Sequence, residues 1–279
     1  MNFSNKDIED YYKQTEIHYR KHWKLKTVQA LHYGLWNKGT KNFSEALINT
    51  NKRIIDLGEI KSNHKILDAG CGIGGTANYI SKNTKANITG ISLNQSQLDF
   101  ASNYSRKHNL KTTFRYSDFC DTPFIEDEFD IVYAIESMCH AKDKKDFLNE
   151  TFRILKPGGK LIILDYFKPQ PLNSKNQNLL NKWLHKWAID DIDVNKDFIE
   201  KSKEVGFYEI VNKNINQEII KSSKRMYRSS FLGAIPSTLY NITHPKVTRF
   251  AKTHFKSGYW QYINLKKGNW AYYQIVLEK

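Results

Sequence analysis

The residues best suited to binding chemistry lie in a glycine-rich stretch, ILDAGCGIGG, at positions 66–75. Apolar residues typical of a buried strand lead through Asp68 into a turn, and TANYISKN follows as a plausible helix. The turn contains four glycines: Gly70, Gly72, Gly74 and Gly75. A backbone without Cβ atoms lets a ligand approach its peptide groups closely. The turn alone predicts a nucleotide-like ligand, with an ordinary tight turn as the alternative.

Two further groups of polar residues follow apolar runs later in the chain. Asp118 and Phe119 close the run TTFRYSDF, where the carboxylate could accept a hydrogen bond from an adenine amino group while the ring packs on the base. A helix cap is the alternative role for such an Asp. Glu136 and His140 follow FDIVYAI, and they would share a face if the chain turned helical there. The alternative for this pair is a structural ion pair or cap.

Alternating strands and helices from residue 64 onward must position these residues. The sequence predicts seven strands: KILDAG, ANITGISL, TTFRYSDF, FDIVYAIES, KLIILDYF, YEIVNKNI and NWAYYQIVLEK. Helices are expected between them, including one over KDKKDFLNETFRILKPGG that ends at Pro157 and Gly158. Repeated β-α-β units predict an α/β fold with a doubly wound, mostly parallel sheet, in which ligands bind at the carboxyl ends of the strands.

The end of the second strand argues against a nicotinamide dinucleotide. The dinucleotide fingerprint is GxGxxG with an acid after the second strand. Here the glycine spacing is GxGxG, and the strand ends in Ser92-Leu93-Asn94 without an acid. An NAD-dependent oxidoreductase is therefore disfavoured.

Taken together, the motifs resemble those of the class I S-adenosylmethionine-dependent methyltransferases. LDAGCGIGG is similar to their first motif, GISLNQSQ to their ribose-side segment, YSDF to their adenine-side segment, and LKPGGKLIILDYF to their post-strand motif. The close match covers residues 64–167. It implies a seven-stranded Rossmann-like methyltransferase fold, with S-adenosylmethionine as the cofactor and S-adenosylhomocysteine as the product.

The resemblance also implies a role for each residue that matches a motif. Gly70, Gly72 and Gly74 would lie against the methionine part of the cofactor, with Asp68 beside them. Ser92, Leu93 and Gln97 would surround the ribose and adenine, and Asp118 and Phe119 would lie at the base. Tyr11 and the region of Tyr33 would close over the top, and Glu136 would complete the site. The cofactor-binding residues expected from the motifs are Tyr11, Tyr33, Asp68, Gly70, Gly72, Gly74, Ser92, Leu93, Gln97, Asp118, Phe119 and Glu136.

Within that superfamily, CGIGG, ISLNQSQ, ESMCH and the early HYGLW are similar to the sterol, tocopherol and related small-molecule methyltransferases. C-methylation of an isoprenoid-like or aromatic acceptor is therefore expected. N-methylation of a small amine, of the coclaurine or glycine/sarcosine type, is the runner-up. Cyclopropanation is less favoured, because the small-residue segment that the mycolic-acid cyclopropane synthases carry in place of HYGLW is not matched.

Glu136 and His140 are the catalytic candidates. Methyl transfer from a sulfonium depends mainly on positioning the acceptor. An amine or hydroxyl acceptor must lose a proton, and His140 could take it near neutral pH. An alkene acceptor would develop positive charge, which Glu136 could stabilise together with aromatic rings from Tyr33, Trp36, Tyr227 or Trp260.

The whole chain is expected to form one methyltransferase domain over residues 1–279. The segments expected within it are an N-terminal helical lid (1–60), a cofactor-binding core (61–167), a first cap insertion (168–195), a second cap insertion (217–267) and a final strand (268–279). The caps would lie over one end of the sheet and contact the acceptor.

Composition adds expectations about partners and location. No secretory signal and no apolar run near the roughly 18 to 20 residues of a membrane span is visible, so a soluble, cytoplasmic protein is expected. The cysteines, Cys71, Cys120 and Cys139, show no metal-ligand or disulfide pattern. Nothing indicates an oligomeric state.

The net charge of +14 leaves several interpretations open. Nucleic-acid methylation is disfavoured, because there are 35 Lys and only 8 Arg, they are scattered along the chain, and no RNA-binding motif is present. A basic cluster in the second cap is either a solvated face or a contact to an anionic acceptor or lipid head group; its members are Lys221, Lys224, Arg225 and Arg228. Peripheral membrane contact is compatible with this pattern.

Overall fold

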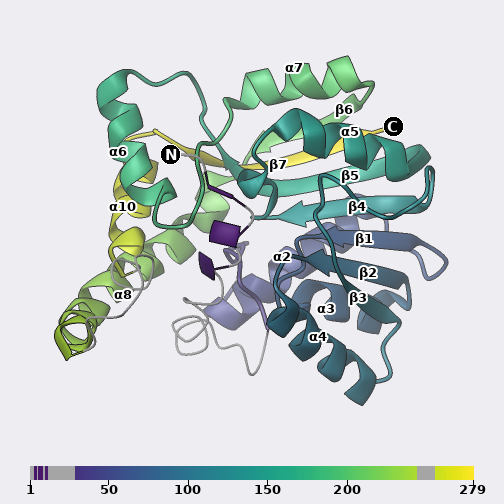
Figure 1. Ribbon diagram of the computed structural model, residues 1–279, viewed down its shortest axis with the longest axis horizontal. Helices are drawn as coiled ribbons and strands as arrows, with labels where there is room; N and C mark the ends of the chain where they lie inside the picture. The colour runs from purple at the N-terminus through teal and green to yellow at the C-terminus, as the bar shows by residue number, and fades with distance from the viewer. Residues whose placement is uncertain (1–2, 5, 9, 12–28, 244–254) are drawn as a thin grey trace.

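A single seven-stranded sheet forms the centre of the molecule (Figure 1). The structure is a computed structural model that describes residues 3–4, 6–8, 10–11, 29–243 and 255–279, with the backbone alone over 233–243. The strand order is β3-β2-β1-β4-β5-β7-β6, and only the pairs that involve β7 are antiparallel. The strands are β1 (Lys65–Ala69), β2 (Asn87–Ser92), β3 (Thr112–Tyr116), β4 (Phe129–Ile135), β5 (Leu155–Phe167), β6 (Tyr208–Asn214) and β7 (Ala271–Glu278).

Helices cover both faces of this sheet, and others gather beyond the carboxyl ends of its parallel strands, on the left in Figure 1. α2 and α3 bury residues such as Ile54 and Ile80 on one face, while α5 and α7 bury Phe147 and Phe198 on the other. α10 packs against both α8 and α6. The helices are α2 (Phe43–Gly58), α3 (Gly75–Thr84), α4 (Gln95–Lys107), the short 3₁₀ helix η1 (Met138–His140), α5 (Lys144–Ile154), α6 (Ser174–Leu184), α7 (Asn195–Val205), α8 (Asn216–Thr243) and α10 (Phe255–Lys266).

The predicted fold class is confirmed, and the seven strands lie close to where the sequence places them. One boundary is wrong. The helix expected to reach Gly158 ends at Ile154, and β5 already begins at Leu155, which pairs with Phe129. Pro157 disfavours helical backbone in the residue before it and has no N–H to donate, so the chain leaves the helix earlier.

The segment HYGLW (32–36) forms neither helix nor strand and is bonded to both α2 and α8. The N–H of Leu35 donates to the carbonyl of Ala46, and that of Trp36 to the carbonyl of Glu218 in α8. Of the N-terminal helical lid expected over residues 1–60, Ile8 and Tyr11 are helical, whereas residues 12–28 lie outside the described residues. Among the described helices, none has the length and apolar character needed to cross a membrane.

Candidate functional site

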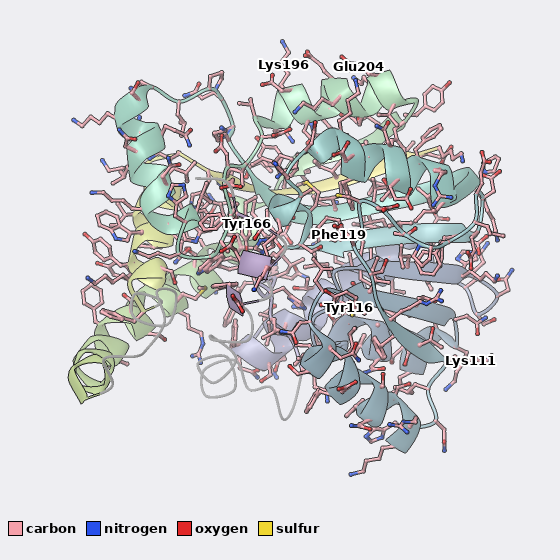
Figure 2. The ribbon with its side chains drawn as sticks, viewed as in Figure 1. Lys111, Tyr116, Phe119, Tyr166, Lys196 and Glu204 are labelled. Atoms are coloured by element: carbon pink, nitrogen blue, oxygen red, sulfur yellow. The ribbon has the colours of Figure 1, made fainter. Side chains whose placement is uncertain are left out.

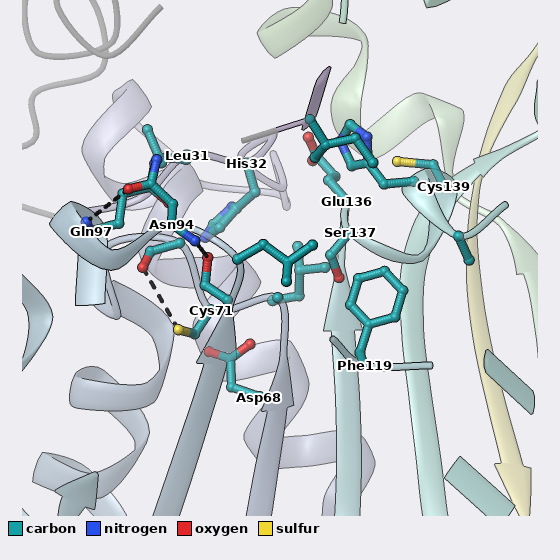
Figure 3. A pocket seen from close by; sticks show the side chains of 18 of the residues that line it. Leu31, His32, Asp68, Cys71, Asn94, Gln97, Phe119, Glu136, Ser137 and Cys139 are labelled. Atoms are coloured by element: carbon teal, nitrogen blue, oxygen red, sulfur yellow. Dashed lines mark hydrogen bonds between the residues drawn. The ribbon is translucent and has the colours of Figure 1, made fainter. Parts of the chain in front are cut away.

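A cavity of about 280 Å³ opens at the carboxyl ends of β1, β2, β3 and β4. Figure 3 shows Asn94 and Gln97 on one side of it and Glu136 and Cys139 on the other. The sheet therefore brings together residues that are far apart in the sequence. The predicted site residues that line this cavity are Tyr11, Asp68, Gly70, Gly72, Ser92, Leu93, Gln97, Asp118, Phe119, Glu136 and His140.

The glycine turn forms one wall of the cavity. Gly70 has φ +101° and Gly72 has φ +50°, in the region that favours glycine. A Cβ on Gly70 would lie 2.3 Å from the Cβ of Ser137, so this position excludes any side chain. At Gly72 the nearest atom to such a Cβ is Leu31 Cδ1 at 3.4 Å, which leaves the backbone open toward the cavity. The turn thus presents bare backbone to a ligand.

Two predicted residues, Gly74 and Tyr33, do not line the cavity. A Cβ on Gly74 would lie 2.6 Å from the Cβ of Ala101 and 2.7 Å from the ring of Phe114, so this glycine lets the turn pack on its neighbours. Tyr33 is fully buried, and its hydroxyl donates to Gln261 Oε1 at 2.7 Å. Tyr33 acts on the site through its backbone, because its N–H donates to Glu136 Oε1 at 2.6 Å.

Asp68 lies at the end of β1 and is buried beneath the turn, as Figure 3 shows. Its Oδ2 accepts a hydrogen bond from the hydroxyl of Tyr133 at 2.7 Å. Burial raises the pKa of Asp68 to about 7, and the bond from Tyr133 opposes that shift. A cation bound nearby would favour the charged carboxylate.

The loop after β2 carries a buried polar group that lacks a partner. Asn94 caps α4, and its Oδ1 accepts from the N–H of Gln97 at 3.2 Å. The other side of the same amide, Nδ2, is buried without a hydrogen-bond partner, although Asn94 lines the cavity. An unpaired buried donor is costly, so this group is well placed to bind an oxygen atom of a ligand.

The end of β3 supplies a turn and an aromatic ring. Asp118 is not a helix cap; its Oδ1 accepts from the N–H of Cys120 at 2.9 Å and so shapes a tight turn. The Phe119 ring meets that of Phe147 edge-on, with centroids 5.5 Å apart. Figure 2 shows Phe119 and Tyr166 near the centre of the molecule, and Figure 3 shows the Phe119 ring across the cavity from Asn94.

Glu136 is the most heavily bonded side chain of the cavity. It follows β4 with φ +52°, which is strained for a residue with a side chain. Its carboxylate accepts from the N–H of Tyr33, from the hydroxyl of Tyr272 at 2.8 Å and from the hydroxyl of Tyr166. Burial raises the pKa of Glu136 to about 8, while these three bonds oppose the shift. Such a group can exchange a proton near neutral pH.

His140 lies at the end of η1 and also lines the cavity, although the segment after Glu136 is a short 3₁₀ helix and not an α-helix. Its Nδ1 lies 3.3 Å from the carbonyl oxygen of Ala188. Burial lowers the pKa of His140 to about 4, so the ring is neutral near pH 7 and binds a proton weakly. Glu136 is therefore the better candidate base.

Aromatic side chains surround Glu136, but they are not the ones the sequence indicates. Tyr166 and Trp187 line the cavity with Ile189. Trp36 packs instead beneath Lys221, whose Nζ lies 5.1 Å from its ring centre, and Trp260 packs beneath Lys182. Tyr227 joins a separate group of rings on α8 and α10. Of the four residues whose rings are expected around Glu136, Tyr33 bonds to it, and it does so through its backbone N–H.

Several lining residues escaped the sequence reasoning. Tyr166 stands near the end of β5, where the rule about strand ends could have identified it. Asn94 lies two residues after β2, and in the sequence it shows only that no acid follows that strand. No sequence signal marks Ser137, whose Oγ donates to the carbonyl of Ala69, or Trp187.

The charges that line the cavity limit what it can bind. Among the described lining residues there are five acids and one Lys, Lys142. The acids are Asp68, Asp118, Glu136, Asp143 and Asp146. No group of three or more His, Cys, Asp or Glu side chains that could hold a metal ion occurs in the described part of the chain. The cavity is therefore suited to a neutral or cationic ligand.

Comparison with known proteins relates the central part of the chain to methyltransferases. Residues 67–163 match the family described as "Methyltransferase domain". A sterol methyltransferase-like 3 protein of Botryococcus braunii is 34% identical over 171 residues, which cover 60% of this chain and 44% of the relative. The chain thus matches less than half the length of that relative.

Two solved structures show the same fold along almost the whole chain. The cyclopropane synthase MmaA2 of Mycobacterium tuberculosis has a TM-score of 0.82 at 15% identity, covering 100% of this chain and 99% of the other. Geranyl diphosphate C-methyltransferase of Streptomyces coelicolor A3(2) has a TM-score of 0.76 at 17% identity, covering 98% and 97%. At these identities the similarity concerns the fold.

Proposed function

We propose that the protein transfers a methyl group from S-adenosylmethionine to a carbon atom of a small, largely apolar, isoprenoid-like acceptor, and the match of residues 67–163 to the methyltransferase domain family supports this. The observation that carries the choice of carbon is Glu136, a buried carboxylate in the cavity lining that is bonded by the hydroxyls of Tyr166 and Tyr272. The sterol methyltransferase-like relatives support the acceptor class.

The residues of the cavity fit S-adenosylmethionine. Gly70 and Gly72 offer a backbone wall without side chains, and the unpartnered Nδ2 of Asn94 offers a donor to a ribose oxygen. Asp68 is a buried carboxylate that a positively charged ligand would stabilise. Phe119 provides a face for a base. When bound, S-adenosylmethionine supplies an electrophilic methyl group on a sulfonium.

Glu136 is suited to the proton transfer that C-methylation requires. A carbon–carbon double bond that gains a methyl group leaves positive charge on the acceptor, and a base must then remove a proton. The pKa of about 8 places Glu136 in the range where it can accept that proton, and the rings of Tyr166 and Trp187 can stabilise the positive charge before the proton leaves. The three hydrogen bonds to Glu136 fix where the proton is taken.

The lining charges favour an acceptor whose reacting part is uncharged. Even with Asp68 and Glu136 protonated, the described lining has three acids against one Lys, which disfavours a diphosphate or carboxylate. Ile8, Tyr11, Trp187 and Ile189 supply an apolar surface instead. We therefore expect an apolar acceptor chain to reach Glu136, with any anionic head group remaining outside this lining.

N-methylation of a small amine is the second candidate, and one observation favours it. A carboxylate among aromatic rings can also bind an ammonium group. An amine acceptor must lose its proton before it reacts, and Glu136 could accept that proton as well. The two candidates differ in the atom that receives the methyl group.

Product analysis separates them. The enzyme is incubated with methyl-deuterated S-adenosylmethionine and a panel of isoprenoid alcohols, isoprenoid diphosphates, sterols and small amines, and products are located by fragmentation mass spectrometry. The proposal predicts a new carbon–methyl bond on an isoprenoid or sterol, and on the order of 10²–10⁴-fold slower turnover in Glu136→Gln, with cofactor binding retained. Methylation of amines alone would establish the second candidate.

A further inference from the structure

The excess positive charge of this protein is concentrated in one segment. Residues 219–277 contain ten Lys and Arg and no Asp or Glu, while the whole chain has a net charge of +14. The Lys and Arg residues are scattered along the chain, as expected, and the charge is concentrated here because this segment contains no acid. The segment includes most of α8 and all of α10, which lie beyond the strand ends at the lower left of Figure 1.

On α8 these cations form a stripe that ends in two exposed apolar residues. The spacing of three to four residues places the members on one side of a helix. The opposite side is buried and carries Ser222, Ser223 and Ser230. We call the exposed side the basic face of α8; it consists of Lys221, Lys224, Arg225, Arg228, Phe231 and Leu232, all of them exposed.

The apolar end of the basic face is unusual for a solvated helix. Phe231 is 55% exposed and Leu232 is 79% exposed, among the highest values for large apolar side chains in the described residues. Aromatic rings extend the apolar area, because Tyr227 contacts Phe231 with centroids 5.0 Å apart and Tyr259 at 5.7 Å. Segments that bind membrane surfaces combine Lys and Arg with Phe and Leu, and the basic face of α8 exposes both kinds of side chain.

We propose that the basic face of α8 docks the protein onto the surface of an anionic phospholipid membrane. The cations complement acidic lipid head groups, and Phe231 and Leu232 enter the boundary between head groups and acyl chains. A nucleic acid would also attract the cations, but it offers no apolar layer for Leu232, and the face carries Lys as often as the Arg that phosphate readout prefers. A lipid surface explains both the cations and the exposed apolar residues of the basic face.

The same helix is connected to the cavity by hydrogen bonds. Ser222 Oγ donates to the carbonyl of Gly34 at 2.8 Å and accepts from Trp36 Nε1 at 3.0 Å. Ser223 Oγ donates to Gln261 Oε1, which also accepts from the hydroxyl of Tyr33. Tyr33 in turn holds Glu136. The docking surface therefore belongs to the group of elements that shapes the acceptor site, although the docking proposal does not depend on the reaction.

Vesicle flotation tests the proposal with the full chain. The protein is mixed at physiological salt with vesicles of phosphatidylcholine and phosphatidylglycerol, or of phosphatidylcholine alone. We expect binding to the anionic vesicles only. Lys224→Gln with Arg228→Gln should weaken that binding on the order of 30-fold. The matched control, Arg106→Gln with Lys107→Gln on α4, removes the same exposed charges and should leave the binding within about threefold of wild type.

The apolar contribution is tested separately. Phe231→Ser with Leu232→Ser should also weaken vesicle binding, whereas Ile125→Ser with Ile210→Ser, at positions that are 72% and 54% exposed, should not. Circular dichroism of each variant verifies that it is folded. The proposal would be overturned if the protein bound neutral vesicles as tightly as anionic ones. It would also be overturned if the α4 control variant lost as much binding as the α8 variant, or if the Phe231 and Leu232 changes had no effect. Preference for single-stranded RNA over anionic vesicles at the same salt would also overturn it.

Discussion

Glu136 stands where four segments of the chain meet. Tyr33 comes from the extended HYGLW segment, Tyr166 from β5 and Tyr272 from β7, and each donates a hydrogen bond to this carboxylate at the end of β4. These three hydrogen bonds fix the position of the carboxylate. Burial raises its pKa to about 8, so its charged and protonated forms have similar free energies near neutral pH.

The pH dependence of turnover should follow the protonation of Glu136. Only the carboxylate can accept a proton, so kcat/KM should rise with pH and level off above about 8. Tyr166→Phe removes a hydrogen bond that lowers this pKa, so the rising limb should move to higher pH. Rate profiles of wild type and variant measure the shift. An unchanged profile in Tyr166→Phe would show that another group limits the reaction.

Gly70 is the glycine whose replacement should damage cofactor binding most directly. In Gly70→Ala the new Cβ meets Ser137 at 2.3 Å, so the turn must move. Gly158→Ala is a matched control, because φ is +75° there and no atom lies within 4 Å of the added Cβ. Both changes should lower the free energy of unfolding by about 1–2 kcal/mol through backbone strain. Calorimetry should show at least tenfold weaker S-adenosylmethionine binding in Gly70→Ala alone; equal affinities would contradict this role.

The elements around the sheet could be predicted to different extents. Short-range patterns, such as the alternation in ANITGISL and the glycines after β1, predict the strands, their order of appearance and the cofactor side of the cavity. The contact between Tyr33 and Glu136 joins residues 103 positions apart and depends on how the caps pack, which no local pattern specifies. The acid-free segment 219–277 is visible in the sequence, but its exposed face becomes apparent only once α8 has buried its serines against the HYGLW segment and α10.

Gln261 on α10 connects α8 to the HYGLW segment. It is fully buried, and its Oε1 accepts from the hydroxyls of Tyr33 and Ser223. Gln261→Met should leave both hydroxyls without this acceptor and lower the free energy of unfolding by about 2–5 kcal/mol. Gln177→Met, which removes bonds of a partly exposed amide on α6, should cost less than about 1 kcal/mol. Urea unfolding of both variants checks this, and similar losses would contradict a connecting role for Gln261.

Acidic and basic residues occupy different parts of the molecule. Acids predominate in the cavity at the strand ends, whereas the segment that includes most of α8 and all of α10 carries cations alone. This arrangement is consistent with a cationic cofactor and an uncharged reacting group inside, and with an anionic surface outside. Net charge alone does not distinguish this arrangement from a uniformly basic surface.

The most direct test of the central claim is calorimetric titration of the purified protein with S-adenosylmethionine and, separately, with NAD⁺. The cavity described above predicts saturable binding of S-adenosylmethionine at one site per chain and no measurable binding of NAD⁺. Saturable heat with NAD⁺ and none with S-adenosylmethionine would contradict the assignment of a methyl-donor site.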